Sequence, residues 1–261
     1  MEAALWVAKT GLDAQQTRMT VIANNLANVN TPGFKRDRAT FEDLLYQNVK
    51  QGGAQTSADT AAPTGLLLGT GTRIVATEKL HAQGNIIQTQ NAFDVAISGE
   101  GFFQILQPDG TLAYSRDGGF KISAEGVLVN SSGYRLQPEL AIPQNAQTVT
   151  IGADGTVSIQ TFGEAAAQTI GQIQVARFLN PSGLQAIGEN LFRETSSSGP
   201  PQVGIPTQQG NGQLIQGALE SSNVNVVEEM VNMIETQRAY EVNSKAIDSV
   251  NSMLQYANNN L

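Results

Sequence analysis

The sequence predicts an α+β fold. We expect a discontinuous α-helical coiled-coil domain formed by both ends of the chain, and a mainly antiparallel β domain in the middle, joined by extended connecting segments. Apolar residues recur at heptad spacing near both termini. Xaa-Gly turn signals separate short apolar runs in the middle, and no long helical pattern stands between those runs. The expected boundaries are residues 1–30 and 224–261 for the terminal helices, 31–75 and 200–223 for the connector, and 76–199 for the β domain.

The first helix is expected over about residues 3–29. It should end at Thr31-Pro32-Gly33-Phe34, because proline disfavours a helical conformation at the preceding residue and Pro-Gly suits a type II turn. Its seam positions alternate three and four residues apart, which is heptad spacing. The seam consists of Leu5, Ala8, Leu12, Gln15, Met19, Ile22, Leu26 and Val29.

The closing helix is expected from Asn225 to Leu261. Asn225 followed by Glu228 has the form of a capping box. The helix alone is compatible with packing on its own domain, but the matching seam of the first helix favours an antiparallel terminal pair. One row of its seam is apolar: Met233, Tyr240, Ile247, Leu254 and Leu261. The alternate row becomes polar after Met230, which favours control of register over stability: Val226, Met230, Gln237, Ser244, Asn251 and Asn258.

The connector has weaker signals. Phe41, Leu44 and Leu45 predict a short helix or turn between Arg38 and Tyr46. The stretch that follows is rich in Gly, Gln, Thr and Ala and has no helical or strand period, which is typical of a flexible loop.

The middle of the chain predicts hairpins at Asp109-Gly110, Glu125-Gly126 and Asp154-Gly155. A low-complexity passage from Ser196 to Gly212 should then lead the chain back across the subunit. Leu214, Ile215, Ala218 and Leu219 are expected to form a strand that pairs with the outgoing connector. The other expected strands cover residues 73–77, 85–88, 95–97, 101–106, 112–114, 120–122, 127–129, 149–151, 157–159 and 172–178.

Composition excludes several functions. The net charge is -8 and no basic cluster occurs, which argues against binding to nucleic acid or anionic membranes. The chain has no cysteine and no apolar run long enough to span a membrane. The only histidine, His81, is expected at the surface or in a turn, and it has no partners at metal-ligand spacing. Arg116-Asp117 is expected to form a local ion pair. We therefore predict no catalytic, cofactor or metal site.

Three stretches resemble the bacterial flagellar rod and hook protein family. ANNLANVNTPGFKR, from Ala23 to Arg36, resembles its amino-terminal signature, and SNVNVVEEMVNMIETQRAYEVNSKAI, from Ser222 to Ile247, its carboxy-terminal signature. DVAISGEGFFQILQPDGTLAYSRDGGF, from Asp94 to Phe120, is similar to its central β region. The whole chain is most similar to the distal rod members. The motif residues are Asn24, Asn25, Asn28, Thr31, Pro32, Gly33, Phe34, Gln237, Arg238, Ala239, Tyr240 and Glu241.

The resemblance implies a structural subunit that polymerises helically with copies of itself into the distal rod, the drive shaft that transmits motor torque to the hook for swimming motility. It implies contacts with proximal rod proteins, the hook protein and the outer ring (bushing) proteins. It also implies export through the flagellar type III apparatus without a cleaved signal peptide, and a location in the basal body from the periplasm to the outer membrane. The expected self-assembly interface is Leu5, Leu12, Met19, Ile22, Leu26, Val29, Met230, Met233, Tyr240, Ile247, Leu254 and Leu261.

The resemblance gives the stretch of about residues 47–63 a further role. In the family, a stretch of this kind after the first helix distinguishes the stiff distal rod from the bendable hook. We therefore expect it to become ordered against neighbouring subunits and to oppose their axial sliding.

Two alternatives remain open. Within the family, the chain could be a proximal rod or hook subunit. In a different class, it could be an oligomeric β-rich binding protein or an enzyme. The absence of convergent acid, base or metal-ligand residues counts against an enzyme, and the low aromatic content of 6% counts against a sugar-binding platform.

Overall fold

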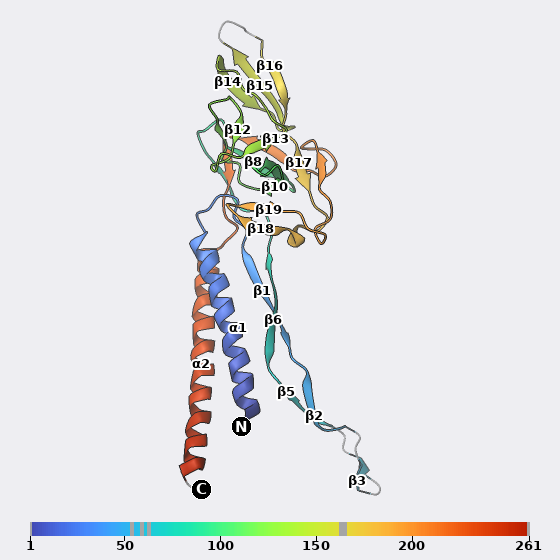
Figure 1. The fold of residues 1–261 in the computed structure, drawn as a ribbon, viewed down its shortest axis with the longest axis vertical. Helices are drawn as coiled ribbons and strands as arrows, with labels where there is room; N and C mark the ends of the chain where they lie inside the picture. The colour runs from blue at the N-terminus through green and yellow to red at the C-terminus, as the bar shows by residue number, and fades with distance from the viewer. Residues whose placement is uncertain (1, 53–54, 58–59, 62–63, 162–165, 260–261) are drawn as a thin grey trace. The chain divides into compact units, whose positions relative to one another are not determined.

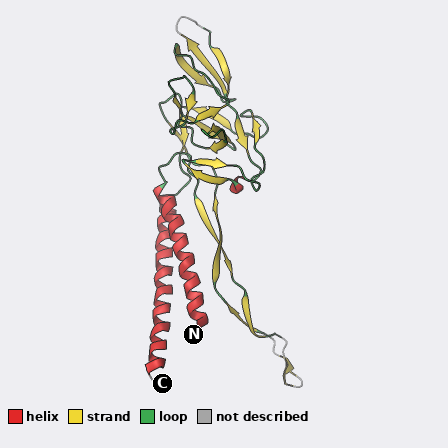
Figure 2. Cartoon of the chain, in the orientation of Figure 1, coloured by secondary structure: helices red, strands yellow, loops and turns green. Residues whose placement is uncertain are grey.

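The chain has two long helices at its ends and a mainly antiparallel β middle, so the predicted α+β class is confirmed (Figure 2). The computed structural model describes residues 2–52, 55–57, 60–61, 64–161 and 166–259. These residues form two compact units. The helical unit contains Met1–Leu26, Asp37–Glu78 and Asn225–Leu261, and the β unit contains Ala27–Arg36 and Lys79–Val224. The expected connector is therefore divided: residues 37–75 belong with the helices, and residues 200–223 with the β unit.

Both terminal helices are confirmed: α1 covers Glu2–Ala27 and α2 covers Val226–Asn259. Asn225 caps α2, because its Oδ1 accepts hydrogen bonds from the backbone N–H groups of Val227 at 3.0 Å and Glu228 at 3.4 Å. The turn after α1 is also as predicted. The N–H of Phe34 donates to the carbonyl of Thr31 at 3.3 Å, and Gly33 has a φ of 69°, as the third position of a type II turn requires.

The remainder of the helical unit is a series of two-stranded ribbons. β1 (Asp37–Asp43) pairs with β6 (Thr72–Lys79), and β2 (Tyr46–Lys50) pairs antiparallel with β5 (Leu66–Gly69). A further short pair is β3 (Gln55–Ser57) with β4 (Thr60–Ala61).

Two expectations for this region are wrong. The segment around Phe41 is a strand and not a helix or turn, and its side chains alternate between partly buried and exposed positions. Much of the stretch of residues 47–63 is in strands and not in a flexible loop. Hydrogen bonds between main-chain groups hold such a ribbon together. Because these bonds do not depend on the side chains, the sequence of a ribbon need not show an apolar period. Residues 53–54, 58–59 and 62–63 of this stretch lie outside the described residues.

The β unit is built around a nine-stranded sheet. Seven strands follow the order β11-β12-β13-β9-β10-β19-β18, and β17 pairs with both β9 and β20. The bounds are β9 Phe102–Leu106, β10 Leu112–Ser115, β11 Lys121–Ile122, β12 Leu128–Val129, β13 Arg135–Gln137, β17 Val175–Arg177, β18 Gln185–Gly188, β19 Leu191–Arg193 and β20 Gln202–Gly204. A 3-10 turn, Pro181–Gly183, precedes β18.

The remaining strands form smaller sheets. β14 (Ala146–Ile151), β15 (Thr156–Thr161) and β16 (Gln168–Gln172) pair in that order. The strand pair expected near Leu214 exists, but its predicted partner is wrong. β21 (Gln213–Gln216) pairs with β8 (Val95–Ser98), and β22 (Ala218–Glu220) with β7 (Ile86–Gln88), so neither pairs with the connector of residues 31–75.

The three predicted hairpins are confirmed, with Gly110, Gly126 and Gly155 at φ values of 82° to 83°. The core of the β unit lies between its sheets. The Phe103 and Phe120 rings meet edge to face with centroids 5.0 Å apart, and Phe103 is fully buried. A second, smaller cluster contains Phe102, Tyr114, Ala176, Phe178, Leu184 and Phe192.

Candidate assembly surfaces

The two helices of the helical unit lie side by side and run antiparallel (Figure 1). Their close approach explains a glycine in the interior of α1. A Cβ placed on Gly11 would lie 3.0 Å from the side-chain nitrogen of Asn243 in α2, which is tighter than ordinary van der Waals contact. A mid-helix glycine costs roughly 1 kcal/mol of helix propensity relative to alanine, so helix contact is the physical reason for it here.

Small or polar residues hold four of the five buried positions of the two helices. These are Ala14 and Asn25 on α1 and Glu229 and Thr236 on α2, and the fifth is the seam residue Ile22. The other predicted seam residues remain partly or largely exposed where they are described. Among the residues of the predicted interface, Ile22 is buried, and three are exposed: Met230, Tyr240 and Leu254. Seven are partly buried: Leu5, Leu12, Met19, Leu26, Val29, Met233 and Ile247. The side chain of Leu261 lies outside the described residues.

A second apolar surface lies on the opposite side of α2. Val227, Val231 and Ile234 stand four and three residues apart, so they share one face of the helix. They are 71%, 50% and 49% exposed, and Val242 extends the row. We call Val227, Val231 and Ile234 the back face of α2. Sequence reasoning missed this surface, although the i, i+4, i+7 spacing was available, because the heptad rows were assigned first.

The β2–β5 ribbon also exposes apolar side chains. Leu66, Leu67 and Leu68 are consecutive in a strand, so they point to alternate faces of the ribbon, and all three are exposed. Tyr46 and Val49 of the paired strand are exposed as well. Within the described residues this two-stranded ribbon has no further layer over either face, so both faces are open to a partner.

The asparagine-rich motif serves local structure. Asn25 is buried, and its side-chain amide pairs with both backbone groups of Asp37. Its Nδ2 donates to the Asp37 carbonyl at 2.9 Å, and its Oδ1 accepts from the Asp37 N–H at 2.8 Å. Asn24 donates to the Asp37 carboxylate at 3.3 Å. Asn28 accepts a hydrogen bond from the hydroxyl of Thr31 at 3.2 Å.

The turn residues of the motif are held by the β unit. The Pro32 carbonyl accepts from Asn190 at 3.2 Å, and the Gly33 N–H donates to the Glu220 carbonyl at 2.8 Å. A Cβ on Gly33 would lie 2.7 Å from the Asp117 backbone nitrogen, so only glycine fits there. The motif in α2 differs, since only Ala239 is partly buried, whereas Gln237, Arg238, Tyr240 and Glu241 are exposed.

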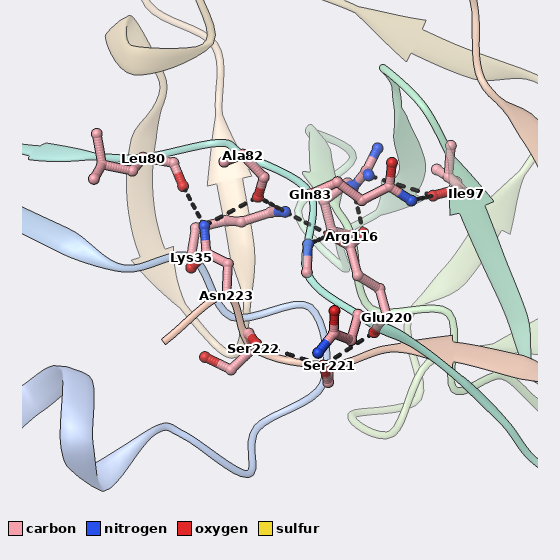
Figure 3. Close-up of polar contacts among 12 residues, drawn as sticks. Lys35, Leu80, Ala82, Gln83, Ile97, Arg116, Glu220, Ser221, Ser222 and Asn223 are labelled. Atoms are coloured by element: carbon pink, nitrogen blue, oxygen red, sulfur yellow. Dashed lines mark hydrogen bonds and ion pairs between the residues drawn. The ribbon is translucent and has the colours of Figure 1, made fainter. Parts of the chain in front are cut away.

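A buried ion-pair cluster lies where the chain enters and leaves the β unit (Figure 3). Glu220 is 1% exposed; its two carboxylate oxygens lie 2.6 Å from Lys35 Nζ and 2.8 Å from Arg116 Nε. Lys35 also donates to the Ala82 carbonyl at 2.8 Å, and Arg116 donates to the carbonyls of Gly99, Gly101 and Ile97. Burial raises the pKa of Glu220, but Arg116 and Lys35 outweigh this and hold that pKa below its usual value. The expected pair of Arg116 with Asp117 is therefore wrong.

Asn223 ties the same chain segments together. Its Oδ1 accepts from the N–H of Arg36 at 2.7 Å, and its Nδ2 donates to the carbonyls of Leu80 and Ala82 at 2.8 and 3.0 Å. Arg36, Leu80 and Asn223 each lie close to a point where the chain passes between the two units.

His81 was expected at the surface or in a turn; it is partly buried and lies in an irregular segment that is not a turn. Its ring lies edge to face against Phe102 and Phe192, with centroids 5.6 and 5.5 Å away. Burial, together with the positive charges of Lys35, Lys79 and Arg116, lowers the pKa of His81 to about 4. His81 borders a cavity of about 310 Å³, whose other walls include Phe178 and Arg177.

Among the described residues, no three His, Asp or Glu side chains are grouped so that they could hold a metal ion. None of the described helices is both long and apolar enough to cross a membrane.

Replacing Glu220 with Gln should destabilise the β unit strongly, because Lys35 and Arg116 then lie buried without a counter-charge. Glu220→Gln is expected to lower the free energy of unfolding by about 3 kcal/mol or more in urea titrations of the full chain. Glu125→Gln, which removes an exposed partner of Arg135 in the same unit, should cost under about 1 kcal/mol. Equal losses for both variants would contradict the structural role of the cluster.

His81 should make the stability of the β unit fall at acid pH. Its pKa is about 4 in the folded chain against an ordinary value of 6.5, so the unfolded state binds the proton more readily between these values. The stability present above pH 6.5 is then lost as the pH falls toward 4, by on the order of 2 kcal/mol. Thermal unfolding of His81→Phe should lack this part of the pH dependence. Parallel melting-temperature profiles for the two proteins would contradict the assignment.

Comparison with known protein families identifies the chain. Family models match at three places: "Flagella basal body rod protein" at residues 5–35, "Flagellar hook protein FlgE/F/G D1 domain" at residues 96–159, and "Flagellar basal body rod FlgEFG protein C-terminal" at residues 215–260. The first match covers most of α1 and the turn after it, the second lies within the β unit, and the third runs from β21 through β22 and α2.

Individual relatives agree over nearly the full length. The flagellar basal-body rod protein FlgG of Buchnera aphidicola subsp. Schizaphis graminum is 54% identical over 97% of both chains. FlgG of Borreliella burgdorferi is 49% identical over 99% of this chain and 98% of its own, and FlgG of Bacillus subtilis is 38% identical over 97% and 96%. The chain therefore belongs to the FlgG family of flagellar basal-body rod proteins, and it is a structural subunit of the rod.

Proposed function

We propose that this chain polymerises helically with copies of itself to form the distal rod, the drive shaft that carries motor torque toward the hook. The terminal helices would form the inner layer of the polymer, and the β units an outer layer. Proximal rod proteins and the hook protein would be its neighbours along the axis, and ring proteins would surround it as bushings. Membership of the rod family supports the assembly, and it also supports delivery by the flagellar type III export apparatus across the periplasm to the outer membrane.

The observation that carries the proposal is the exposed apolar area of the helical unit. Helix α2 has apolar side chains on its α1-facing side and on its back face, and within the described part of the chain the back face remains exposed. Burying a Val, Leu or Ile side chain contributes roughly 1.5 to 3 kcal/mol, so covering Val227, Val231 and Ile234 together favours association strongly. Copies of the same chain are the partners that a homopolymer supplies.

The predicted interface residues now divide into two groups. Ile22, Met233 and Ile247 are covered at least partly within the chain, so they stabilise the helix pair that each subunit presents. Met230, Tyr240 and Leu254 remain exposed and are the members of the predicted interface that we assign to contacts between subunits.

The β2–β5 ribbon is the second proposed contact. With leucines on both faces, it fits a position between neighbouring subunits on two sides. A ribbon clamped in this way opposes axial sliding of one subunit past another, because sliding exposes its leucines to water. This supports the proposal that the stretch of residues 47–63 stiffens the rod.

A charge on the back face of α2 should abolish polymerisation while the subunit still folds. In Val231→Asp, the carboxylate lies on an exposed position of the free chain, so circular dichroism and the melting temperature should change little. Burying an unpaired charge in the polymer costs several kcal/mol, so rods should be absent in electron micrographs and cells should not swim. Ser132→Asp adds the same charge at an exposed turn of the β unit and should leave rods intact. Normal motility with Val231→Asp would rule out this face as an interface.

Removing the ribbon should soften the rod. Deletion of residues 47–63 is expected to yield filaments that bend in micrographs, because neighbours can then slide. The matched point variant Leu66→Ser with Leu68→Ser changes only exposed side chains on one face of β5 and should shorten the measured persistence length in the same direction. Straight rods from both variants would contradict a stiffening role.

A further inference from the structure

The cavity beside His81 has the size of a small ligand site. Its volume is about 310 Å³, at the lower end of the range for pockets that hold small molecules. Its walls come from five separate parts of the chain, at Lys35, Gly101, Arg116 and Phe178 and around His81. All of these parts belong to the β unit, so the shape of the cavity is set within one compact unit.

One part of the wall is apolar. The rings of Phe102 and Phe178 line the cavity and meet edge to face, with centroids 5.9 Å apart. Pro181 also lines the cavity. An apolar or aromatic group that leaves water and packs against these side chains is stabilised by the hydrophobic effect and by contacts with the ring edges and faces.

The polar part of the wall is positively charged. Lys35, Arg116 and Arg177 line the cavity. The first two share one carboxylate, Glu220, so the two cations and one anion of this buried cluster leave a net charge of +1 (Figure 3). The carboxylate of Glu100 lies 3.7 Å from Arg177, but its side chain is 75% exposed, so water screens it.

The ring of His81 is sensitive to this charge. Burial is the largest cause of its lowered pKa, and the positive charges of Lys35, Lys79 and Arg116 lower that pKa further. Its Nδ1 is buried and has no hydrogen-bond partner in the described part of the chain. Buried polar atoms nearly always have such a partner, and a molecule in the adjoining cavity can supply one.

Two of the cations keep N–H groups for a ligand. The Lys35 ammonium has three, of which two are used by the Ala82 carbonyl at 2.8 Å and Glu220 at 2.6 Å. Arg177 has five, and one donates to the Gln209 carbonyl at 3.3 Å. The separation of 3.7 Å between Arg177 Nε and Glu100 is too long for a hydrogen bond. As far as the chain is described, the other N–H groups of both side chains are open to an acceptor.

We propose that this cavity binds a small monocarboxylate whose body is aromatic or branched and apolar. The carboxylate accepts hydrogen bonds from Arg177 and Lys35, and the body packs against Phe102 and Phe178. A single negative charge matches the net charge of the buried cluster, whereas a dianion such as phosphate brings a second charge into the cavity and has no apolar part for the rings. The proposal does not depend on polymerisation, because the cavity is complete within one chain.

His81 is the only histidine of the chain, so its ring signals give a specific test by nuclear magnetic resonance. Benzoate is titrated into the dilute full chain labelled with isotopic histidine, and benzamide serves as an uncharged probe of the same shape. We expect saturable shifts with benzoate, with a dissociation constant of about 1 mM or lower, and binding of benzamide that is weaker by about tenfold or more. Bound benzoate should also raise the pKa of His81, because its charge offsets that of the neighbouring cations.

Variants test the role of the charges. Arg177→Gln should weaken benzoate binding by about tenfold or more with little change in melting temperature, whereas Arg193→Gln, at an exposed position of the same sheet, should bind like the wild type. If Arg177→Gln does not fold, Glu100→Gln provides the opposite test, because removing the exposed negative charge should tighten binding. The proposal is overturned by the absence of saturable shifts with benzoate, by equal binding of benzamide, by equal losses in the two arginine variants, or by weaker binding to Glu100→Gln.

Isolated rods distinguish two sources of the carboxylate. Equilibrium dialysis measures benzoate bound per subunit in the free chain and in rods. Equal binding in both would support a free small molecule as the ligand. Binding by the free chain that is lost in rods would support a carboxylate from a neighbouring chain. Benzoate binding by the free chain and rod formation are separate measurements, so the failure of this proposal would leave the proposed function standing.

Discussion

The constraint on which the structure depends is that α2 is apolar on two sides and that, among the described residues, α1 covers one of them while Val227, Val231 and Ile234 stay exposed. Helix α1 covers the side that contains Thr236 and Asn243, through the close approach at Gly11. The back face stays in water in the isolated subunit, where it gains nothing from the hydrophobic effect. A helix with this pattern reaches a lower free energy when a partner covers the back face, and under the proposed function copies of the same chain are that partner.

The Glu220 cluster plays the complementary part in the β unit. Lys35 and Glu220 are separated by 185 positions in the chain, yet they meet at 2.6 Å, next to the segments that lead toward α1 and α2. Separating a buried ion pair leaves a charge without a partner and costs several kcal/mol of free energy, so this junction resists local unfolding. Asn223 adds hydrogen bonds to two other passing segments. A subunit that transmits torque needs such a junction, because load passes along few covalent connections.

The sequence predicted what depends on local pattern. Heptad spacing located both helices, Asn225 marked the start of α2, and Asp-Gly and Glu-Gly pairs located three hairpins. It could not predict pairings that depend on tertiary position. Arg116 was assigned to its neighbour Asp117, whereas its partner Glu220 lies 104 positions away. The strand around Phe41 was missed because its apolar residues fit a helical turn equally well, and only pairing with β6 decides between them. The back face of α2 was overlooked because a heptad seam explains one side of a helix, and a second apolar side becomes visible only when exposure is known.

The most direct test of this account is the accessibility of the back face before and after assembly. In the cysteine-free background, Ile234→Cys provides one thiol on that face, and its rate of reaction with a maleimide can be measured in the free subunit and in isolated rods. The account predicts rapid labelling of the free subunit and strong protection in the rod, whereas a cysteine at exposed Ser132 in the β unit should react at a rate that changes less. Equal labelling of Ile234→Cys in both states would show that the back face remains in water, and would contradict the central claim.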